Sequence, residues 1–305
     1  MRSVTYQLSW TQSVQFGGTY IAQDEGLFSD AGLDVTLAPG GPDVAGDATT
    51  VSGQSLVNIS TADGVARSNE SGADLVIIGA QYQKAANTIL SLADQPITTP
   101  QDLVGKRIGV SGSDTPALDA FLEINGIDES SVEFVPTEYD PAALVAGQVD
   151  GIFCFYNDLP VSLEAEGIAG YSMLLSDFGY DPMSQVYTVL RSSLEDPDTR
   201  QEIVDLIRAD AEGWQLYRDD TDAAAELAVE MYPDAGLDLE TQKIQARVQL
   251  DLMFSDVTDE YGFGWFTDEE IASNLELFTV LGIDADESLW DRSILEEIYA
   301  DGPVA

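Results

Sequence analysis

Residues 9–28, with the sequence SWTQSVQFGGTYIAQDEGLF, join a predicted strand to a predicted helix. In the overlapping stretch 3–10, apolar and polar side chains alternate, which is typical of a strand covered on one face. Trp10 then stands at the carboxyl end of this strand, and Gly17 and Gly18 let the backbone turn before the helix begins. A strand, a glycine turn and a helix in this order indicate the first βα unit of an open α/β sheet.

The loop after this strand is a candidate binding surface. Ligands of open α/β sheets bind beyond the carboxyl ends of the strands, close to helix N-termini. Trp10, Gln15 and Phe16 occupy that place, and an aromatic surface with nearby amides suits the floor of a binding site. The alternative interpretation makes Trp10 and Phe16 core aromatics and the two glycines no more than a turn.

The composition limits the class of function. The 305 residues, 44% of them hydrophobic, supply enough core for two domains, and no apolar run approaches the ~20 residues of a membrane-spanning helix. A formal charge of -43 repels nucleic acids and anionic membranes, so we expect neither as a partner. Histidine is absent and Cys154 is the only cysteine, which removes histidine-based acid–base catalysis, cysteine-rich zinc sites and internal disulfides. We therefore expect a protein that is not an enzyme and holds no cofactor or metal.

Strands and helices alternate along the chain, which predicts two sets of parallel βα units. Extended segments at 87–93 and 185–192 are predicted to carry the chain from one lobe to the other and back, and the chain is predicted to be helical from residue 197. The predicted fold is α/β, with two lobes, two hinge crossings and a helical C-terminal part. The predicted divisions are 1–90 for the first part of lobe 1, 91–188 for lobe 2, and 189–305 for the second part of lobe 1.

Polar and aromatic residues gather in the predicted loops, most of them at the carboxyl ends of strands, where the two lobes are expected to close around a ligand. Aromatic rings offer stacking surfaces worth about 0.5–1.5 kcal/mol each beyond area burial, and amides or carboxylates recognise the edge of a ring. The predicted ligand-binding residues are Trp10, Gln15, Phe16, Gln54, Asp63, Gln81, Tyr82, Ser113, Asp114, Thr115, Tyr156 and Asn157.

Four stretches resemble the NMT1/THI5-like group of type II periplasmic solute-binding proteins, which are receptors of ABC importers. The resemblance covers nearly the whole chain, and it implies a monomeric receptor on the outer side of the cytoplasmic membrane that delivers a small molecule to a membrane permease. The exported form is expected to be secreted or lipid-anchored after its signal segment is removed. The four stretches are SWTQSVQFGGTYIAQDEGLFSDAGLDV at 9–35, GGPDV at 40–44, ILSLADQPITTPQDLVGKRIGVSG at 89–112 and VDGIFCFYNDLPVSLEAEG at 149–167.

The resemblance also implies a class of ligand. In this family the first-strand tryptophan commonly stacks on a flat heterocycle such as a thiamine pyrimidine precursor, and related members resemble riboflavin receptors. Trp10 holds that position here. Pyrimidine-binding members often carry Asn and His in the following loop, where this chain has Ser13 and Phe16, which enlarges the aromatic surface.

Two alternatives accompany this interpretation. Sister families bind nitrate, sulfonate or taurine-like anions, but the predicted loops contain no arginine and Lys84 is the nearest cation. A yeast branch of the family synthesises the pyrimidine, consuming its own histidine with pyridoxal phosphate and using a cysteine-rich motif. This chain has no histidine, and Cys154 lies in an apolar stretch that predicts a buried, inert thiol.

The excess of carboxylates generates a prediction about salt. With 55 Asp plus Glu and lysine only at Lys84, Lys106 and Lys243, the chain resembles proteins of extreme halophiles, in which salt screens the repulsion between carboxylates. The rival interpretation is an acidic secreted protein from an ordinary-salt habitat. We expect circular dichroism spectra to show folding in molar salt and loss of structure in dilute buffer. Complete folding without salt would exclude the halophile interpretation.

Overall fold

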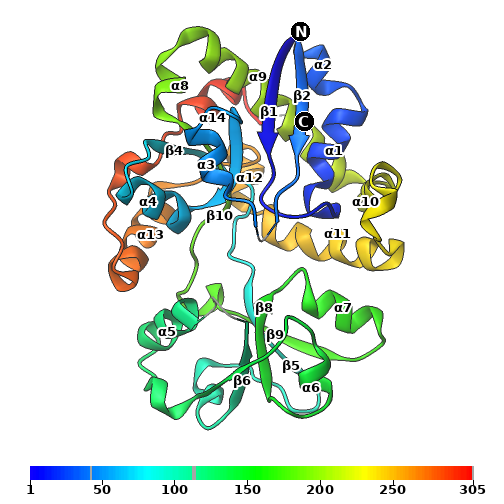
Figure 1. Ribbon diagram of the computed structural model, residues 1–305, viewed down its shortest axis with the longest axis vertical. Coiled ribbons are helices and arrows are strands. Elements are labelled where there is room, and N and C mark those ends of the chain that lie inside the picture. The colour runs from blue at the N-terminus through cyan, green and yellow to red at the C-terminus, as the bar shows by residue number, and fades with distance from the viewer. Residues whose placement is uncertain (42, 112–114, 304–305) are drawn as a thin grey trace. The chain divides into compact units, whose positions relative to one another are not determined.

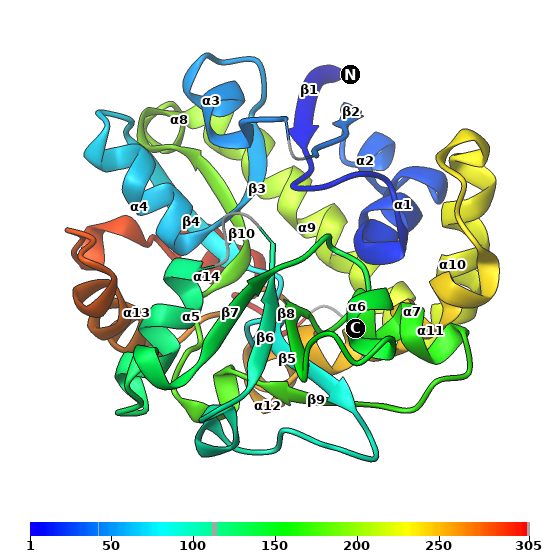
Figure 2. The ribbon, with the colours of Figure 1, turned by 60° about the horizontal axis from the view of Figure 1, so that its bottom comes forward.

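The computed structural model describes residues 1–41, 43–111 and 115–303 and forms two compact units, each built on a five-stranded sheet (Figures 1 and 2). The predicted two-unit α/β fold with a helical C-terminal part is confirmed. The chain passes from unit 1 to unit 2 after Gln83 and returns after Pro182. The predicted boundaries at 90 and 188 lie several residues later, inside strands. Unit 1 comprises Met1–Gln83, Met183–Leu275 and Ile283–Ala305, and unit 2 comprises Lys84–Pro182 and Glu276–Gly282.

The unit 1 sheet has the strand order β2-β1-β3-β10-β4. Strand β1 (Arg2–Gln7) pairs in parallel with β2 (Leu33–Ala38) and β3 (Val57–Thr61). Strand β10 (Ser184–Leu190) lies antiparallel between β3 and β4 (Leu75–Ala80). The returning segment that the sequence predicts as a hinge is therefore an internal strand of this sheet, and its backbone groups are paired on both sides.

The two glycines of the opening stretch have a different role from the predicted one. Gly17 and Gly18 are the first residues of helix α1 (Gly17–Asp24), and Gly17 has a helical φ of -56°. Both are fully buried where α1 packs on α9 (Pro197–Asp219), and a Cβ on Gly18 would lie 2.2 Å from Cδ2 of Trp214. The absence of a side chain thus lets the backbone of α1 approach the indole closely.

The long helix α9 is well defined at its start and closely packed in its middle. The side chain of Asp196 caps it by accepting a hydrogen bond from the Thr199 N–H at 2.8 Å, and a proline follows the cap. Trp214 is fully buried and stacks on Phe263 with ring centroids 5.6 Å apart. The other unit 1 helices are α2 (Leu27–Asp30), α3 (Gly46–Val51), α4 (Ala62–Glu70), α8 (Arg191–Glu195), α10 (Thr221–Met231), α11 (Leu239–Met253), α12 (Asp256–Tyr261) and α14 (Ser293–Ile298).

The unit 2 sheet has the order β7-β6-β8-β5-β9. Strand β6 (Arg107–Val110) pairs in parallel with β7 (Glu133–Pro136) and β8 (Gly151–Phe155). Strand β5 (Asn87–Leu92), the other predicted hinge segment, lies antiparallel between β8 and β9 (Gly170–Leu174). The helices of this unit are α5 (Thr115–Ile124), α6 (Ala142–Val145) and α7 (Leu159–Ala165).

Helix α13 (Asp268–Leu281) is divided between the two units. It begins in unit 1, and its last residues join unit 2, where Leu277 packs in one core cluster with Phe121 and Phe153. Cys154, on the other face of the sheet, is buried as predicted and packs in a second cluster. No helix in the described ranges is both long and apolar enough to cross a membrane.

The contact between α1 and α9 predicts the effect of Gly18→Ala. The added methyl group has no room beside a fully buried indole, so the variant should lose about 1–3 kcal/mol of unfolding free energy through overpacking. Urea denaturation followed by circular dichroism measures the loss.

Gly46→Ala is the matched control, because a Cβ on Gly46 would have no neighbour closer than 3.5 Å. This control should change the stability little. A Gly18→Ala variant as stable as the wild type would show that the packing of α1 on α9 adjusts at little cost.

Candidate ligand-binding site

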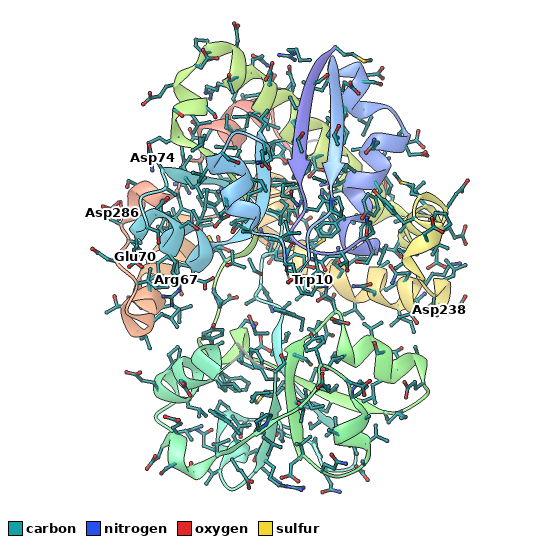
Figure 3. The ribbon with its side chains drawn as sticks, viewed as in Figure 1. Trp10, Arg67, Glu70, Asp74, Asp238 and Asp286 are labelled. Atoms are coloured by element: carbon teal, nitrogen blue, oxygen red, sulfur yellow. The ribbon has the colours of Figure 1, made fainter. Side chains whose placement is uncertain are left out.

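Trp10 lies in the loop beyond the tip of β1, at the carboxyl edge of the parallel strands of unit 1 (Figure 3). The strand ends at Gln7 rather than at Trp10, so the indole belongs to the loop, and 47% of its surface is exposed. Tyr6 and Leu8 are buried, as the alternating pattern predicts, but the alternation stops before Trp10. The core interpretation of Trp10 is therefore wrong, and a large flat ring faces solvent at this edge.

The backbone of this loop is firmly held. The side-chain amide of Gln7 is buried and donates to the carbonyl oxygens of Leu8 at 2.9 Å and Ala38 at 3.1 Å. The N–H of Gly40 donates to the carbonyl oxygen of Trp10 at 2.9 Å, and a Cβ on Gly40 would lie only 2.4 Å from the Leu8 oxygen. The loops after β1 and β2 thus interlock, and the indole stands on a fixed backbone.

Two other predicted residues of the opening stretch lie close to Trp10 in the chain but differ in exposure. Phe16 is fully buried, with its ring centroid 6.4 Å from that of Tyr20, so it supports the loop from inside and offers no face to a solute. The core interpretation thus holds for Phe16. Gln15 is half-buried, and its carbonyl oxygen accepts a hydrogen bond from Nε2 of Gln249 at 3.0 Å. Contact between the Gln15 side chain and a ligand stays a prediction.

The predicted residues after β4 are buried. Only 1% of Gln81 and 5% of Tyr82 is exposed. The Nε2 of Gln81 donates to Oη of Tyr6 at 3.3 Å and lies 3.5 Å from Oδ2 of Asp210. The amide that the sequence assigns to a ligand edge is therefore engaged inside unit 1.

Asp210 is the centre of this internal network, and no residue pattern predicts it. Its carboxylate is fully buried on α9, and Oδ2 accepts hydrogen bonds from Oη of Tyr187 at 2.5 Å, Nε1 of Trp214 at 3.2 Å and Oη of Tyr6 at 3.4 Å. Burial raises the pKa of Asp210 to about 6, because the loss of hydration outweighs the donors that favour the charged form. The network joins β1, β10 and α9 with Gln81, the residue that follows β4.

The remaining unit 1 candidates lie at opposite ends of β3. Asp63 is half-buried in the first turn of α4, directly after the carboxyl end of the strand. Gln54 is exposed in the turn before the strand begins. Because β1 and β3 are parallel and Tyr6 pairs with Val57, Gln54 lies toward the amino ends of the strands while Trp10 lies beyond their carboxyl ends. The structure therefore does not bring Gln54 to the candidate site.

Two residues at this edge were missed by sequence reasoning. Oγ of Ser9 donates to Oε1 of Gln185 at 2.8 Å, and the carbonyl oxygen of Gln185 accepts from the Gln81 N–H at 2.9 Å. The contact joins residues 176 positions apart, so no local sequence pattern predicts it. Ser9 and Gln185 add neutral polar groups beside Trp10.

Unit 2 carries aromatic residues at the carboxyl ends of its own parallel strands. Tyr156 is half-buried and Asn157 is buried directly after β8. Phe155 and Tyr139, which the prediction omitted, are 48% and 39% exposed, and the Phe155 N–H donates to Oη of Tyr139 at 3.2 Å. Strand β8 is buried on both faces up to Cys154, so no alternation along it marks Phe155 as exposed, and only its place at the end of the strand distinguishes it.

The predicted lip of unit 2 is described in part. Ser113 and Asp114 lie outside the described residues. Thr115 is the first residue of α5, so its backbone occupies the helix start that the sequence predicts near this point.

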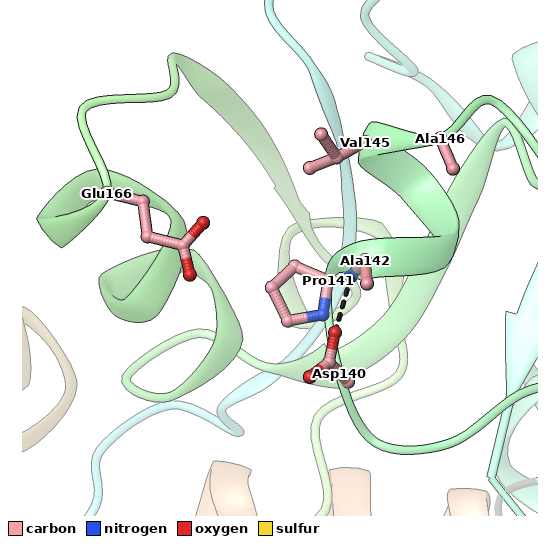
Figure 4. Close-up of a pocket in the computed structure, with 6 residues that line it drawn as sticks. All are labelled: Asp140, Pro141, Ala142, Val145, Ala146 and Glu166. Carbon is pink, nitrogen blue, oxygen red and sulfur yellow. Dashed lines mark hydrogen bonds between the residues drawn. The ribbon is translucent and has the colours of Figure 1, made fainter.

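A hollow of about 260 Å³ lies elsewhere on unit 2 (Figure 4). Asp140 and Glu166 approach it from different sides, and Oδ1 of Asp140 already accepts the Ala142 N–H at 2.6 Å. None of its lining residues belongs to the predicted site, and the described residues contain no group of three acidic or cysteine side chains that could hold a metal ion. The lining residues are Asp140, Pro141, Ala142, Val145, Ala146 and Glu166.

Comparison with known proteins agrees with this architecture. The sequence profile of a family described as NMT1/THI5 like matches residues 13–224. The riboflavin-binding protein RibY of Chloroflexus aurantiacus is 23% identical over 91% of this chain and 80% of its own length. The formylaminopyrimidine-binding protein of Halalkalibacterium halodurans is 27% identical over 55% of this chain and 52% of its own length.

Solved structures share the fold. The periplasmic aliphatic sulphonate binding protein SsuA of Escherichia coli matches with a TM-score of 0.70 at 16% identity, over 98% of this chain and 99% of that chain. At this identity the likeness concerns the fold and not the ligand.

The buried carboxylate predicts a pH dependence of stability. The pKa of Asp210 in the folded protein, about 6, lies above its ordinary value of 3.8, so the folded state binds more protons than the unfolded state between these values. The contribution of Asp210 to the unfolding free energy is therefore complete below pH 4 and is lost as the pH rises through about 6, a change of about 3 kcal/mol.

Asp210→Asn removes this titration. The difference in unfolding free energy between wild type and variant should decline by that amount from pH 4 to pH 7, as measured by urea denaturation at fixed salt. The exposed Asp234→Asn variant serves as the control for a carboxylate-to-amide change at the surface. A pH-independent difference for Asp210→Asn would mean that the carboxylate does not titrate in this range.

Proposed function

Because the chain belongs to the NMT1/THI5-like family, we propose that it is the solute-binding receptor of an ABC importer and binds a planar, uncharged aromatic heterocycle. The receptor works outside the cytoplasmic membrane and delivers its ligand to a permease. The observation that carries the proposal is the exposed indole of Trp10 on a backbone that Gln7 and Gly40 hold in place.

The indole suits a flat ligand for a physical reason. Most large aromatic side chains of unit 1, Trp214 and Phe263 among them, are fully buried, whereas nearly half of Trp10 is exposed. Its backbone is already ordered, so stacking a ring on it costs little conformational entropy. Each such stack contributes about 0.5–1.5 kcal/mol beyond the burial of apolar area.

The groups near Trp10 favour a neutral ligand with hydrogen-bonding edges. Ser9 and Gln185 supply a hydroxyl group and an amide, and Asp63 supplies a carboxylate at the end of β3. The names of the relatives RibY and the formylaminopyrimidine-binding protein denote ligands that contain flat nitrogen heterocycles. A flavin-like or aminopyrimidine ligand matches this chemistry.

An anionic ligand such as a sulfonate or nitrate fits the described residues less well. Lys84, the cation nearest to the predicted loops, lies 3.8 Å from the Asp177 carboxylate within unit 2. Arg107 stands at the amino end of β6 and pairs with Asp150 at 2.8 Å. A formal charge of -43 also repels an approaching anion, so neutral capture is favoured.

Binding rather than catalysis is the activity that these residues support. The single thiol, on Cys154, is 1% exposed within β8, and the chain contains no histidine. The family branch that makes a pyrimidine depends on both kinds of side chain, so pyrimidine synthesis is the least supported alternative.

Replacing Trp10 tests the proposal. Trp10→Ala should weaken binding of riboflavin or an aminopyrimidine at least tenfold, which corresponds to about 1.4 kcal/mol, because the stacking surface is lost. Isothermal titration calorimetry measures the affinity, and an absorbance scan of freshly purified protein detects any flavin that it carries.

Tyr171→Ala is the control, since Tyr171 is 41% exposed. It pairs with Ser91 near one end of β5, whereas Phe155 pairs with Asn87 at the other end. The Tyr171→Ala variant should bind as the wild type does. Undiminished affinity in Trp10→Ala would remove the indole from the site, and a wild-type protein that binds sulfonates but no heterocycle would replace the proposal with the anion alternative.

A further inference from the structure

Gln185 has a backbone conformation that is unusual for a residue with a side chain. Its φ is +52°, and no other non-glycine residue in the described ranges has a positive φ. This left-handed region is adopted readily by glycine and at a cost of about 1 kcal/mol or more by most other residues. The pairing of β10 with β3 shifts its register at Gln185, so this residue forms a bulge. Bulges commonly re-aim a side chain next to a functional site.

The bulge directs the Gln185 side chain to the loop that carries the exposed indole. Oγ of Ser9, the neighbour of Trp10, donates to Oε1 of Gln185 at 2.8 Å, and the Gln81 N–H holds the Gln185 carbonyl oxygen at 2.9 Å. Gln81 is itself anchored in the network around Asp210. The amide oxygen and the backbone of Gln185 are therefore both fixed.

The amide nitrogen of Gln185 differs from its amide oxygen in hydrogen bonding. Nε2 has no hydrogen-bond partner among the described residues, and the side chain is half-buried. This nitrogen carries two N–H donors and cannot accept a hydrogen bond. Its natural partner is an oxygen or a ring nitrogen with a free lone pair, whereas an exocyclic amine would meet it with a second donor.

The conformational strain supports a functional role for this side chain. A glycine at position 185 would adopt φ +52° without steric cost but would present no amide. Strained residues are retained chiefly where their geometry serves binding or catalysis. Position 185 thus carries a side chain although its backbone conformation favours glycine.

Resting on the function proposed above, we propose that Gln185 determines ligand specificity: its Nε2 donates to a ring carbonyl of the heterocycle that stacks on Trp10. The favoured ligand class is then an oxo-heterocycle of the flavin type, whose carbonyl oxygen accepts from Nε2, over an aminopyrimidine, which offers only ring nitrogens as acceptors. Ser9 acts as a positioning residue, because its hydroxyl group holds Oε1 and thereby turns Nε2 outward.

Titrations of the full chain with two probes test this assignment. Wild type, Gln185→Glu and Gln185→Gly are each titrated with riboflavin and with 4-amino-2-methylpyrimidine by calorimetry, in salt that keeps the protein folded. Wild type should prefer riboflavin. Gln185→Glu should bind riboflavin at least tenfold more weakly, because a carboxylate faces the carbonyl, and should bind the aminopyrimidine equally or better. Gln185→Gly should lose affinity for riboflavin alone while its melting temperature is maintained.

Gln101→Glu provides the control for added charge, since Gln101 is exposed on unit 2, and it should alter neither affinity. A riboflavin affinity unchanged in Gln185→Gly would overturn the assignment, as would an equal loss for both probes or a wild-type preference for the aminopyrimidine. If Gln185→Glu does not fold, Gln185→Gly carries the comparison. A wild type that binds neither probe contradicts the proposed function itself, whereas loss of binding in Trp10→Ala with no effect at Gln185 contradicts only the specificity role.

Discussion

The buried carboxylate of Asp210 is the interaction on which unit 1 depends. Removing a carboxylate from water costs several kcal/mol, and the hydroxyl, indole and amide donors that converge on Oδ2 offset part of this cost. Tyr6 comes from β1, Tyr187 from β10 and Trp214 from α9. Because the donors lie on elements far apart in the chain, only the native arrangement of these elements satisfies the carboxylate.

The candidate site is built on this network. Gln81 links Asp210 to the backbone of Gln185, and the side-chain oxygen of Gln185 accepts a hydrogen bond from Ser9, the neighbour of Trp10. On the other side, Gln7 and Gly40 fix the same loop from β1 and β2. A rigid support of this kind pre-organises the indole, so that the free energy of stacking is not spent on ordering the loop.

Acidity shapes the surface of the protein but not the chemistry near Trp10. Asp74, Asp238 and Asp286 lie on the outside of unit 1 (Figure 3), and they belong to the 55 acidic residues that give the chain its net negative charge. Most basic side chains are engaged in ion pairs, such as that of Arg107 with Asp150. Such a surface repels anionic ligands, while neutral rings are unaffected.

The sequence by itself determined the two-unit α/β fold, the family and the place of Trp10 near the carboxyl end of the first strand, because alternating and helical periodicities and motif order are local properties of the chain. Only the tertiary structure decided that Phe16 and Gln81 are buried, that Gly17 and Gly18 serve helix packing, and that Gln185 meets Ser9. The physical reason is that the burial of a loop side chain depends on what packs over it. In this chain the contacting residues lie far along the sequence: Asp210 is 129 positions from Gln81, and Trp214 packs on Gly18 from still farther away, beyond the reach of any local pattern.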